Sequence, residues 1–149
     1  MSYANDMPST IATLELASEL RVSLMRVARR LRSERVDEGL TLTQLSVLGS
    51  LERHGAMTLG ELAAHEKVQP PSMTRTTAAL EERGLVTRLA HPTDGRQVLV
   101  DVSDAGRALL REDRRRREAW LAGRLENLTS VERALLHEVA PLLDRLAQS

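Results

Sequence analysis

The sequence predicts a mainly α-helical chain that carries one small β-hairpin. Over most of the chain the apolar residues recur at steps of three and four, which is the period of an amphipathic helix. Three Thr-x-x-Gln or Thr-x-x-Glu patterns, beginning at Thr41, Thr58 and Thr129, have the form of capping boxes at helix N-termini. Only residues 86–102 change to the alternating pattern of strands.

The length and composition indicate one folded unit that contains neither disulfide bonds nor metal sites with cysteine ligands. A chain of 149 residues fits a single unit over 1–149 that can bury a core, and the absence of cysteine excludes disulfides. No apolar run approaches the ~20 residues that span a bilayer, so we expect a soluble, cytoplasmic protein without a membrane partner. The formal net charge of zero argues weakly against nucleic-acid binding, although the distribution of charge matters more than its sum.

One long helix is expected after a loose polar tail at residues 1–8. Its apolar stripe begins at Ile11 and continues at helical spacing through Leu31. We expect this helix to end near Gly39, because glycine ends helices readily and a new start signal follows at Thr41.

Three shorter helices are expected next. The boxes Thr41-Leu-Thr-Gln44 and Thr58-Leu-Gly-Glu61 begin the second and third helices, and the third is short, ending near His65. A fourth helix starts near Pro70, where the missing N–H has no intrahelical partner to lose. Gly84 can take the left-handed position after this helix, which gives it a length of about 14 residues.

The hairpin and two further helices complete the chain. Residues 86–90 and 97–102 alternate around a loop with Pro and Asp-Gly, which predicts the only β-structure of the chain. Ser103 can cap a helix that contains eight consecutive charged residues, which we interpret as a solvated surface with pairs such as Arg114–Glu118. The last helix begins at Thr129, and Pro141 inside it predicts a kink or a short break.

Three helices followed by a hairpin is the order of a winged helix-turn-helix, here over 41–102. In such a unit the fourth helix enters the DNA major groove, and its N-terminal half contains no acidic residue. Its candidate DNA-contacting residues are Gln69, Pro71, Ser72, Met73, Thr74, Arg75 and Thr77, with Met73 suited to a thymine methyl group. The alternative is that these polar residues form only the solvated face of a surface helix.

Several segments in the same order resemble the multiple-antibiotic-resistance regulator (MarR) family. They are Leu59-Gly-Glu-Leu-Ala63, Ser72-Met-Thr-Arg75, Leu80-Glu-Glu-Arg-Gly-Leu-Val86, Asp94-Gly-Arg96 and Val102-Ser-Asp-Ala-Gly106. The resemblance implies a winged helix-turn-helix plus a helical dimerisation layer, which 10–38 and 104–148 would form in a homodimer. It implies double-stranded DNA as partner, and a repressor on a pseudo-palindromic operator is the leading hypothesis.

The resemblance also assigns the hairpin loop as a DNA-contacting wing. It implies that Arg96 lies in or beside the minor groove while Asp94 holds the loop, although the two could form only a turn-stabilising ion pair. Arg88 and His91 are the other wing candidates, with His91 as a phosphate neighbour. The chain departs from the family at Glu66-Lys67, where an apolar residue and a glycine are common, which predicts a turn of different shape and offers Lys67 to a phosphate.

A small aromatic or amphipathic acid that releases the DNA is the ligand that the resemblance implies. Met25, His54 and Trp120 are candidates for its site, and each could equally be a core or surface residue. We expect no cofactor and no metal, because the four histidines fall in different elements without ligand spacing. No nucleophile–base pair or phosphate-binding glycine loop indicates an enzyme. A winged-helix scaffold for protein–protein contact, without DNA affinity, is the alternative that the zero net charge supports.

Overall fold

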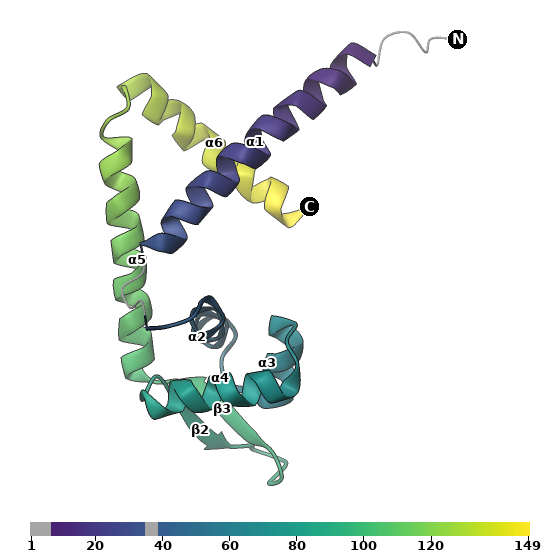
Figure 1. The fold of residues 1–149 in the computed structure, drawn as a ribbon, viewed down its shortest axis with the longest axis vertical. Helices are drawn as coiled ribbons and strands as arrows, with labels where there is room; N and C mark the ends of the chain where they lie inside the picture. The colour runs from purple at the N-terminus through teal and green to yellow at the C-terminus, as the bar shows by residue number, and fades with distance from the viewer. Residues whose placement is uncertain (1–6, 35–38) are drawn as a thin grey trace. The chain divides into compact units, whose positions relative to one another are not determined.

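Six helices and a small sheet make up the part of the chain that the structure, a computed structural model, describes: residues 7–34 and 39–149 (Figure 1). These elements form two units. One contains α2, α3, α4, the sheet and the N-terminal part of α5, and the other contains α1, the C-terminal part of α5 and α6. Within the described residues, no helix is long and apolar enough to cross a membrane.

Helix α1 spans Met7–Ser33, so the prediction that it ends near Gly39 is wrong. The hydroxyl of Ser33 donates to the carbonyl oxygen of Arg30 at 2.7 Å, and the Glu34 amide donates to Leu31 at 3.3 Å. A serine that binds a carbonyl of the preceding turn competes with the helical pattern, and the helix ends there. Most of the expected tail, residues 1–6, lies outside the described residues, and so do residues 35–38.

Helices α2 (Leu42–His54), α3 (Leu59–Glu66) and α4 (Pro70–Glu82) lie close to their predicted positions. Both capping boxes are confirmed: the Gln44 amide donates to Thr41 Oγ1 at 3.1 Å, and the Glu61 amide donates to Thr58 Oγ1 at 3.1 Å. Gly84 follows α4 with φ +71°, which glycine adopts without a steric penalty. The amide of the next residue, Leu85, donates to the carbonyl oxygen of Leu80 at 2.9 Å, and this bond closes the end of the helix as predicted.

The sheet has three strands, one more than predicted. Strands β2 (Val86–Ala90) and β3 (Val98–Val102) pair antiparallel as the expected hairpin, with Val86 opposite Val102 and Ala90 opposite Val98. Strand β1, only Met57–Thr58, pairs with the other edge of β3, giving the order β1-β3-β2. Two residues are too short to show a period, and Thr58 also serves as the cap of α3, so the pattern did not reveal this strand.

The buried core belongs to the unit that contains the sheet. It is built from leucine, valine, methionine and alanine side chains of α2, α3, α4, β2, β3 and α5, among them Val47, Leu48, Leu51, Leu62, Met73, Leu80, Val100 and Leu110. Helix α5 (Asp104–Leu125) contributes Leu110 to this core, and Ser103 caps the start of the helix. The Ser103 hydroxyl donates to Gly84 at 2.6 Å and accepts from the Gly106 amide at 3.1 Å.

The other unit leaves many large apolar side chains of α1 and α6 exposed. Helix α6 spans Ser130–Gln148 behind the predicted Thr129 box, and it continues through Pro141, which excludes a break, one of the two predicted effects of this proline, and leaves a kink as a prediction. The proline removes only the bond to the His137 carbonyl, on an exposed part of the helix where water can replace it. No residue of α6 is buried. Helices α1 and α6 cross in Figure 1 and, with the end of α5, line an apolar cavity of about 600 Å³.

Candidate nucleic-acid interface

The N-terminal half of α4 presents a polar face. Gln69, Pro71, Thr74 and Arg75 are exposed, and Ser72 is half-buried. The Thr74 hydroxyl donates to Pro70 at 3.0 Å and keeps its acceptor lone pairs for an outside donor. Within the described residues, the Arg75 guanidinium has no hydrogen bond or ion pair. This face can donate to phosphate oxygens or to base edges.

Met73 and Thr77 do not belong to that face. Their exposed fractions are 0% and 1%, and the Thr77 hydroxyl donates to the carbonyls of Met73 and Thr74 at 2.9 and 3.1 Å. Placing these two side chains at DNA was wrong, because their positions on α4 point into the core, where Met73 packs with Leu80 and Leu62. The burial of Thr77 was not predicted because threonine is polar; its hydroxyl can be buried because it donates to carbonyls of its own helix.

Arg88, a predicted wing residue, is tied to the far end of α4. Its Nε donates to Glu81 Oε2 at 2.6 Å, and both side chains are about two-fifths exposed. The pair links β2 to the acidic end of the helix. Arg88 therefore has a structural partner that the sequence did not reveal, since seven residues and a change of element separate the two.

The loop between β2 and β3 is held by its own side chains. His91 Nδ1 accepts from the amides of Thr93 at 3.2 Å and Asp94 at 3.0 Å, which leaves Nε2 for an outside partner. Asp94 Oδ1 accepts from the Arg96 amide at 3.0 Å, and its carbonyl accepts from Gln97 at 3.1 Å. In the described part of the chain the exposed Arg96 guanidinium has no ion pair, so the carboxylate holds the backbone of the loop and not the charged group.

A shallow pocket of about 330 Å³, lined by both polar and apolar side chains, lies between this hairpin and the start of α3. Arg88, Arg96 and Gln97 line it on the hairpin side, and Thr58 and Gly60 line it on the helix side. Sequence analysis did not predict that Thr58 and Gly60 line this pocket, because it identified Thr58 only as a helix cap. Arginines beside a helix N-terminus suit an anion such as a backbone phosphate.

The turn between α3 and α4 has two unusual residues. Lys67 takes the left-handed conformation at φ 54°, ψ 44°, and it is the only non-glycine residue with positive φ in the described segments. The carboxylate of Glu66, just before it, accepts from Ser46 Oγ at 2.7 Å and from Ser50 Oγ at 2.6 Å, both on α2. The sequence indicated an unusual turn here, but these partners lie 16 and 20 residues away and were not predicted.

The charged block of α5 makes specific contacts. Arg114 donates to Glu52 of α2 at 2.7 and 3.3 Å, in place of the predicted pair with Glu118, and Arg115 pairs with Glu112 at 2.6 Å. The bond from Arg114 lowers the pKa of Glu52 below its usual value. Asp113 is buried. The block is therefore partly a docking surface within the sheet-containing unit.

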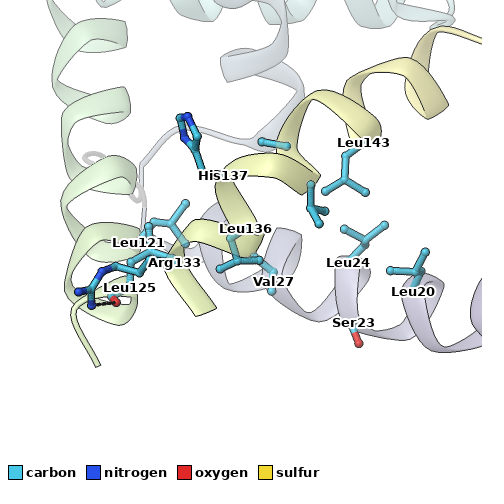
Figure 2. Close-up of a pocket in the computed structure, with 12 residues that line it drawn as sticks. Leu20, Ser23, Leu24, Val27, Leu121, Leu125, Arg133, Leu136, His137 and Leu143 are labelled. Carbon is cyan, nitrogen blue, oxygen red and sulfur yellow. Dashed lines mark hydrogen bonds between the residues drawn. The ribbon is translucent and has the colours of Figure 1, made fainter. Parts of the chain in front are cut away.

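The candidate ligand residues do not share one unit. Met25 and Trp120 belong to the α1–α6 unit, where Met25 is exposed, whereas His54 belongs to the other unit and its ring lies 4.9 Å from that of His65. None of the three candidates lines the 600 Å³ cavity, whose walls are mainly leucine, valine and alanine (Figure 2). The described residues contain no group of three or more side chains suited to a metal ion.

Trp120 has a distinctive environment. The guanidinium carbons of Arg30 and Arg124 lie 5.5 and 5.4 Å from its ring centroid, within cation–π range. Its indole nitrogen is buried and has no hydrogen-bond partner among the described residues. A buried N–H donor on a ring that two cations approach could serve an anionic acceptor.

A helical lobe with a three-stranded sheet and an exposed arginine on the hairpin defines the class: a winged helix-turn-helix DNA-binding protein. The MarR family model matches residues 40–98. The chain is 48% identical over 128 residues to the HTH-type transcriptional regulator Mb0904 of Mycobacterium bovis, covering 86% of this chain and 90% of that protein. It is 29% identical to the transcriptional repressor MdtR of Bacillus subtilis, covering 91% and 88%.

A solved structure has the same architecture. The putative transcriptional regulator from Pseudomonas aeruginosa PA01 superimposes with a TM-score of 0.81 at 38% identity, covering 92% of this chain and 97% of that one. The chain belongs to the MarR family of HTH-type transcriptional regulators, which are DNA-binding proteins and not enzymes.

Proposed function

We propose that the protein is a transcriptional repressor that binds a pseudo-palindromic operator as a homodimer. Each winged lobe would read one half-site, and the half-site centres would lie about 10 bp apart, one turn of DNA. The B. subtilis relative MdtR is named a repressor, which supports the direction of regulation. DNA as the partner also favours the cytoplasm as the site of action.

The observation that carries this proposal is the pair of exposed guanidinium groups on the two predicted DNA-contacting elements. Arg75 on α4 and Arg96 on the wing have no ion pair within the described residues. Because the chain has no net charge, affinity would come from such placed cations and not from a general positive field. Lys67, Ser72 and Thr74 would add polar contacts beside Arg75. Zero net charge is the main support for a protein–protein scaffold, and membership of a DNA-binding family counts against that alternative.

The homodimer is supported by the apolar surface of α1 and α6. Large apolar side chains remain exposed along both helices: Ile11, Leu14, Leu16, Leu24, Met25 and Val27 on α1, and Val131, Leu135, Leu136, Leu142 and Leu146 on α6. An exposed apolar surface of this extent is typical of a protein interface. A second copy of the same two helices would bury it.

DNA binding by Arg75→Ala and Arg96→Ala variants tests the proposed contacts. The probe is a duplex selected by the wild-type protein from random DNA, compared with a scrambled duplex of the same composition. We expect each variant to bind the selected duplex roughly 5- to 100-fold more weakly. Arg75→Ala should also relax base preference, whereas Arg96→Ala should weaken both duplexes if it contacts a phosphate.

Arg111→Ala, which removes an exposed cation from α5, is the matched control and should bind as the wild type does. Unchanged affinity in both test variants would refute the proposed contacts. A wild-type protein that enriches no sequence would count against the operator itself.

We also propose that a small aromatic carboxylate releases the DNA by binding at Trp120. The support is the indole N–H, which has no hydrogen-bond partner among the described residues and belongs to a ring that the guanidinium groups of Arg30 and Arg124 approach; it could donate to the carboxylate. Trp120 is the only tryptophan of the chain, so its fluorescence reports on this position alone. Met25 and His54 remain secondary candidates.

Benzoate is a suitable first probe. We expect saturable quenching of Trp120 fluorescence over the concentration range in which benzoate releases the selected duplex. Trp120→Phe, which keeps an apolar ring but has no N–H, should need about tenfold more benzoate for release. A Trp120→Phe variant that is released as easily as the wild type would disprove the assignment.

A further inference from the structure

Glu66 lies at the point where the chain turns from α3 into α4. It is the last residue of α3, and α4 begins four residues later at Pro70. Its two carboxylate oxygens accept from two hydroxyls of α2, Oε2 from Ser46 at 2.7 Å and Oε1 from Ser50 at 2.6 Å. Ser46 and Ser50 are four residues apart, so they lie on the same face of α2. One side chain therefore joins the end of α3 to two successive turns of α2.

The bond to Ser50 lies in a buried position. Ser50 is 1% exposed, and without Glu66 its hydroxyl would lose an acceptor where little water can replace it. The Ser46 end is exposed, so water can replace that bond more easily. The inner oxygen of Glu66 is thus the one that specifies where the end of α3 sits against α2.

The backbone directly after Glu66 is strained. Lys67 has φ 54°, a region that residues with a Cβ rarely occupy, and its amide and that of Val68 donate back to Ala64 and Ala63 at 3.3 and 3.0 Å. Such a conformation persists only where surrounding contacts hold it. The bonds of Glu66 to α2 are contacts of this kind, since they anchor the residue that precedes the strained one.

We propose that Glu66 is a positioning residue that sets the orientation of α4 for base readout. The carboxylate touches no DNA in this role; it acts through the turn, whose geometry determines where Gln69, Ser72 and Arg75 point. The inference rests on the proposed function of α4 as the DNA-reading helix. It also explains why an acidic residue can stand in a DNA-binding lobe, since its charge is engaged by two hydroxyls.

Four variants separate positioning from stability and from charge. Glu66→Ala removes the tie, and Glu66→Gln retains one acceptor and gains one donor for the same serines. Glu82→Ala removes an exposed carboxylate from the end of α4 without touching the turn. Glu66→Ala combined with Lys67→Gly removes the tie but also relieves the strained φ.

The main readout is the ratio of affinities for the wild-type-selected duplex and its scrambled counterpart. We expect Glu66→Ala to lower this ratio at least about fivefold, the loss that follows from one misplaced base contact. Glu66→Gln and Glu82→Ala should stay within about twofold of the wild type. The Lys67→Gly double variant should recover the melting temperature lost in Glu66→Ala, but not the ratio.

Amide hydrogen exchange of residues 67–80 gives a readout that does not depend on DNA. We expect faster exchange in Glu66→Ala and near-wild-type exchange in Glu66→Gln. Unchanged exchange or an unchanged ratio in Glu66→Ala would overturn the proposal, and so would a ratio restored by Lys67→Gly or lowered equally by Glu82→Ala. Failure of the wild type to select any duplex would instead refute the proposed operator, while the exchange measurement would still decide the role of Glu66.

Discussion

At the residue scale, Gly106 illustrates how a missing side chain positions a helix. It lies in the first turn of α5 and is buried against Leu85, the residue just before β2, and against the last strand. A Cβ at this position would overlap the carbonyl oxygen of Leu85 and lie 2.7 Å from Val102 Cγ2. Because backbone cannot move aside as a flexible side chain can, the close approach of α5 to Leu85 requires glycine.

Gly106→Ala should therefore destabilise the protein by about 1–3 kcal/mol, the usual cost of overpacking a core. Gly123→Ala is a matched control on the same helix, where a Cβ would meet nothing within 4 Å. That change should leave stability unchanged or raise it by up to about 1 kcal/mol, since alanine is the better helix former. Urea denaturation followed by circular dichroism measures both, and equal effects would contradict the packing argument.

At the scale of elements, α5 is attached to α2 by a charge pair as well as by apolar packing. Arg114 binds both carboxylate oxygens of Glu52, the two-pronged geometry that arginine favours. This bond, more than the charges of Arg114, Arg107 and Arg111, lowers the pKa of Glu52. The pair is half exposed on the arginine side, which limits what it contributes.

The lowered pKa gives this pair a defined pH dependence. A carboxylate whose folded pKa is depressed adds stability above its unfolded pKa, and the gain disappears as the pH falls through the folded value. Glu52→Gln should reduce the free energy of unfolding at pH 7 by less than about 1 kcal/mol. The difference from the wild type should shrink as the pH falls below 4.5, the usual glutamate value.

Denaturant titrations at pH 7 and at successively lower pH values measure that difference. Glu118→Gln, an exposed carboxylate on the same helix, is the control and should have little effect at any of them. A Glu52→Gln deficit that grows on acidification would have the wrong sign for this pair.

At the scale of the whole molecule, the two units differ in how completely they bury their apolar residues. The described residues of the core cluster all belong to the sheet-containing unit, whereas α6 buries none of its residues. The winged lobe buries a core of apolar residues, whereas α1 and α6 leave many of theirs exposed to solvent. This difference favours assembly through α1 and α6. The proposed homodimer would then also determine the distance between two DNA-reading lobes.

A Leu135→Glu, Leu142→Glu double variant tests this assembly. We expect it to have the mass of one chain by light scattering, because charges on both exposed leucines would be buried in the dimer. Its affinity for the selected duplex should fall on the order of 100-fold, since two linked half-site contacts become one. Leu42→Glu, an exposed leucine of the winged lobe, is the matched control and should remain dimeric. A double variant that stays dimeric would exclude this face of α6 as the interface.

Features determined by neighbouring residues could be predicted from the sequence. The capping boxes at Thr41, Thr58 and Thr129 act over three residues, and Gly84 and the hairpin also depend on local pattern. The family motifs then indicated the winged fold and the exposed arginines. The residues predicted to contact DNA included Met73 and Thr77, whose burial depends on which side of α4 faces the core, and contact by the exposed residues of that set stays a prediction.

The sequence by itself thus determined the class of protein, the order of its elements and the loop on which Arg96 is displayed. Only the tertiary structure decided what holds those elements in place: the tie from Glu66 to Ser50, the pair of Arg88 with Glu81, and the contact of Gly106 with Leu85. The reason is physical, because each of these contacts joins residues from different elements. Their distances arise only when the whole lobe has folded, whereas a cap or a turn forms from the few residues beside it.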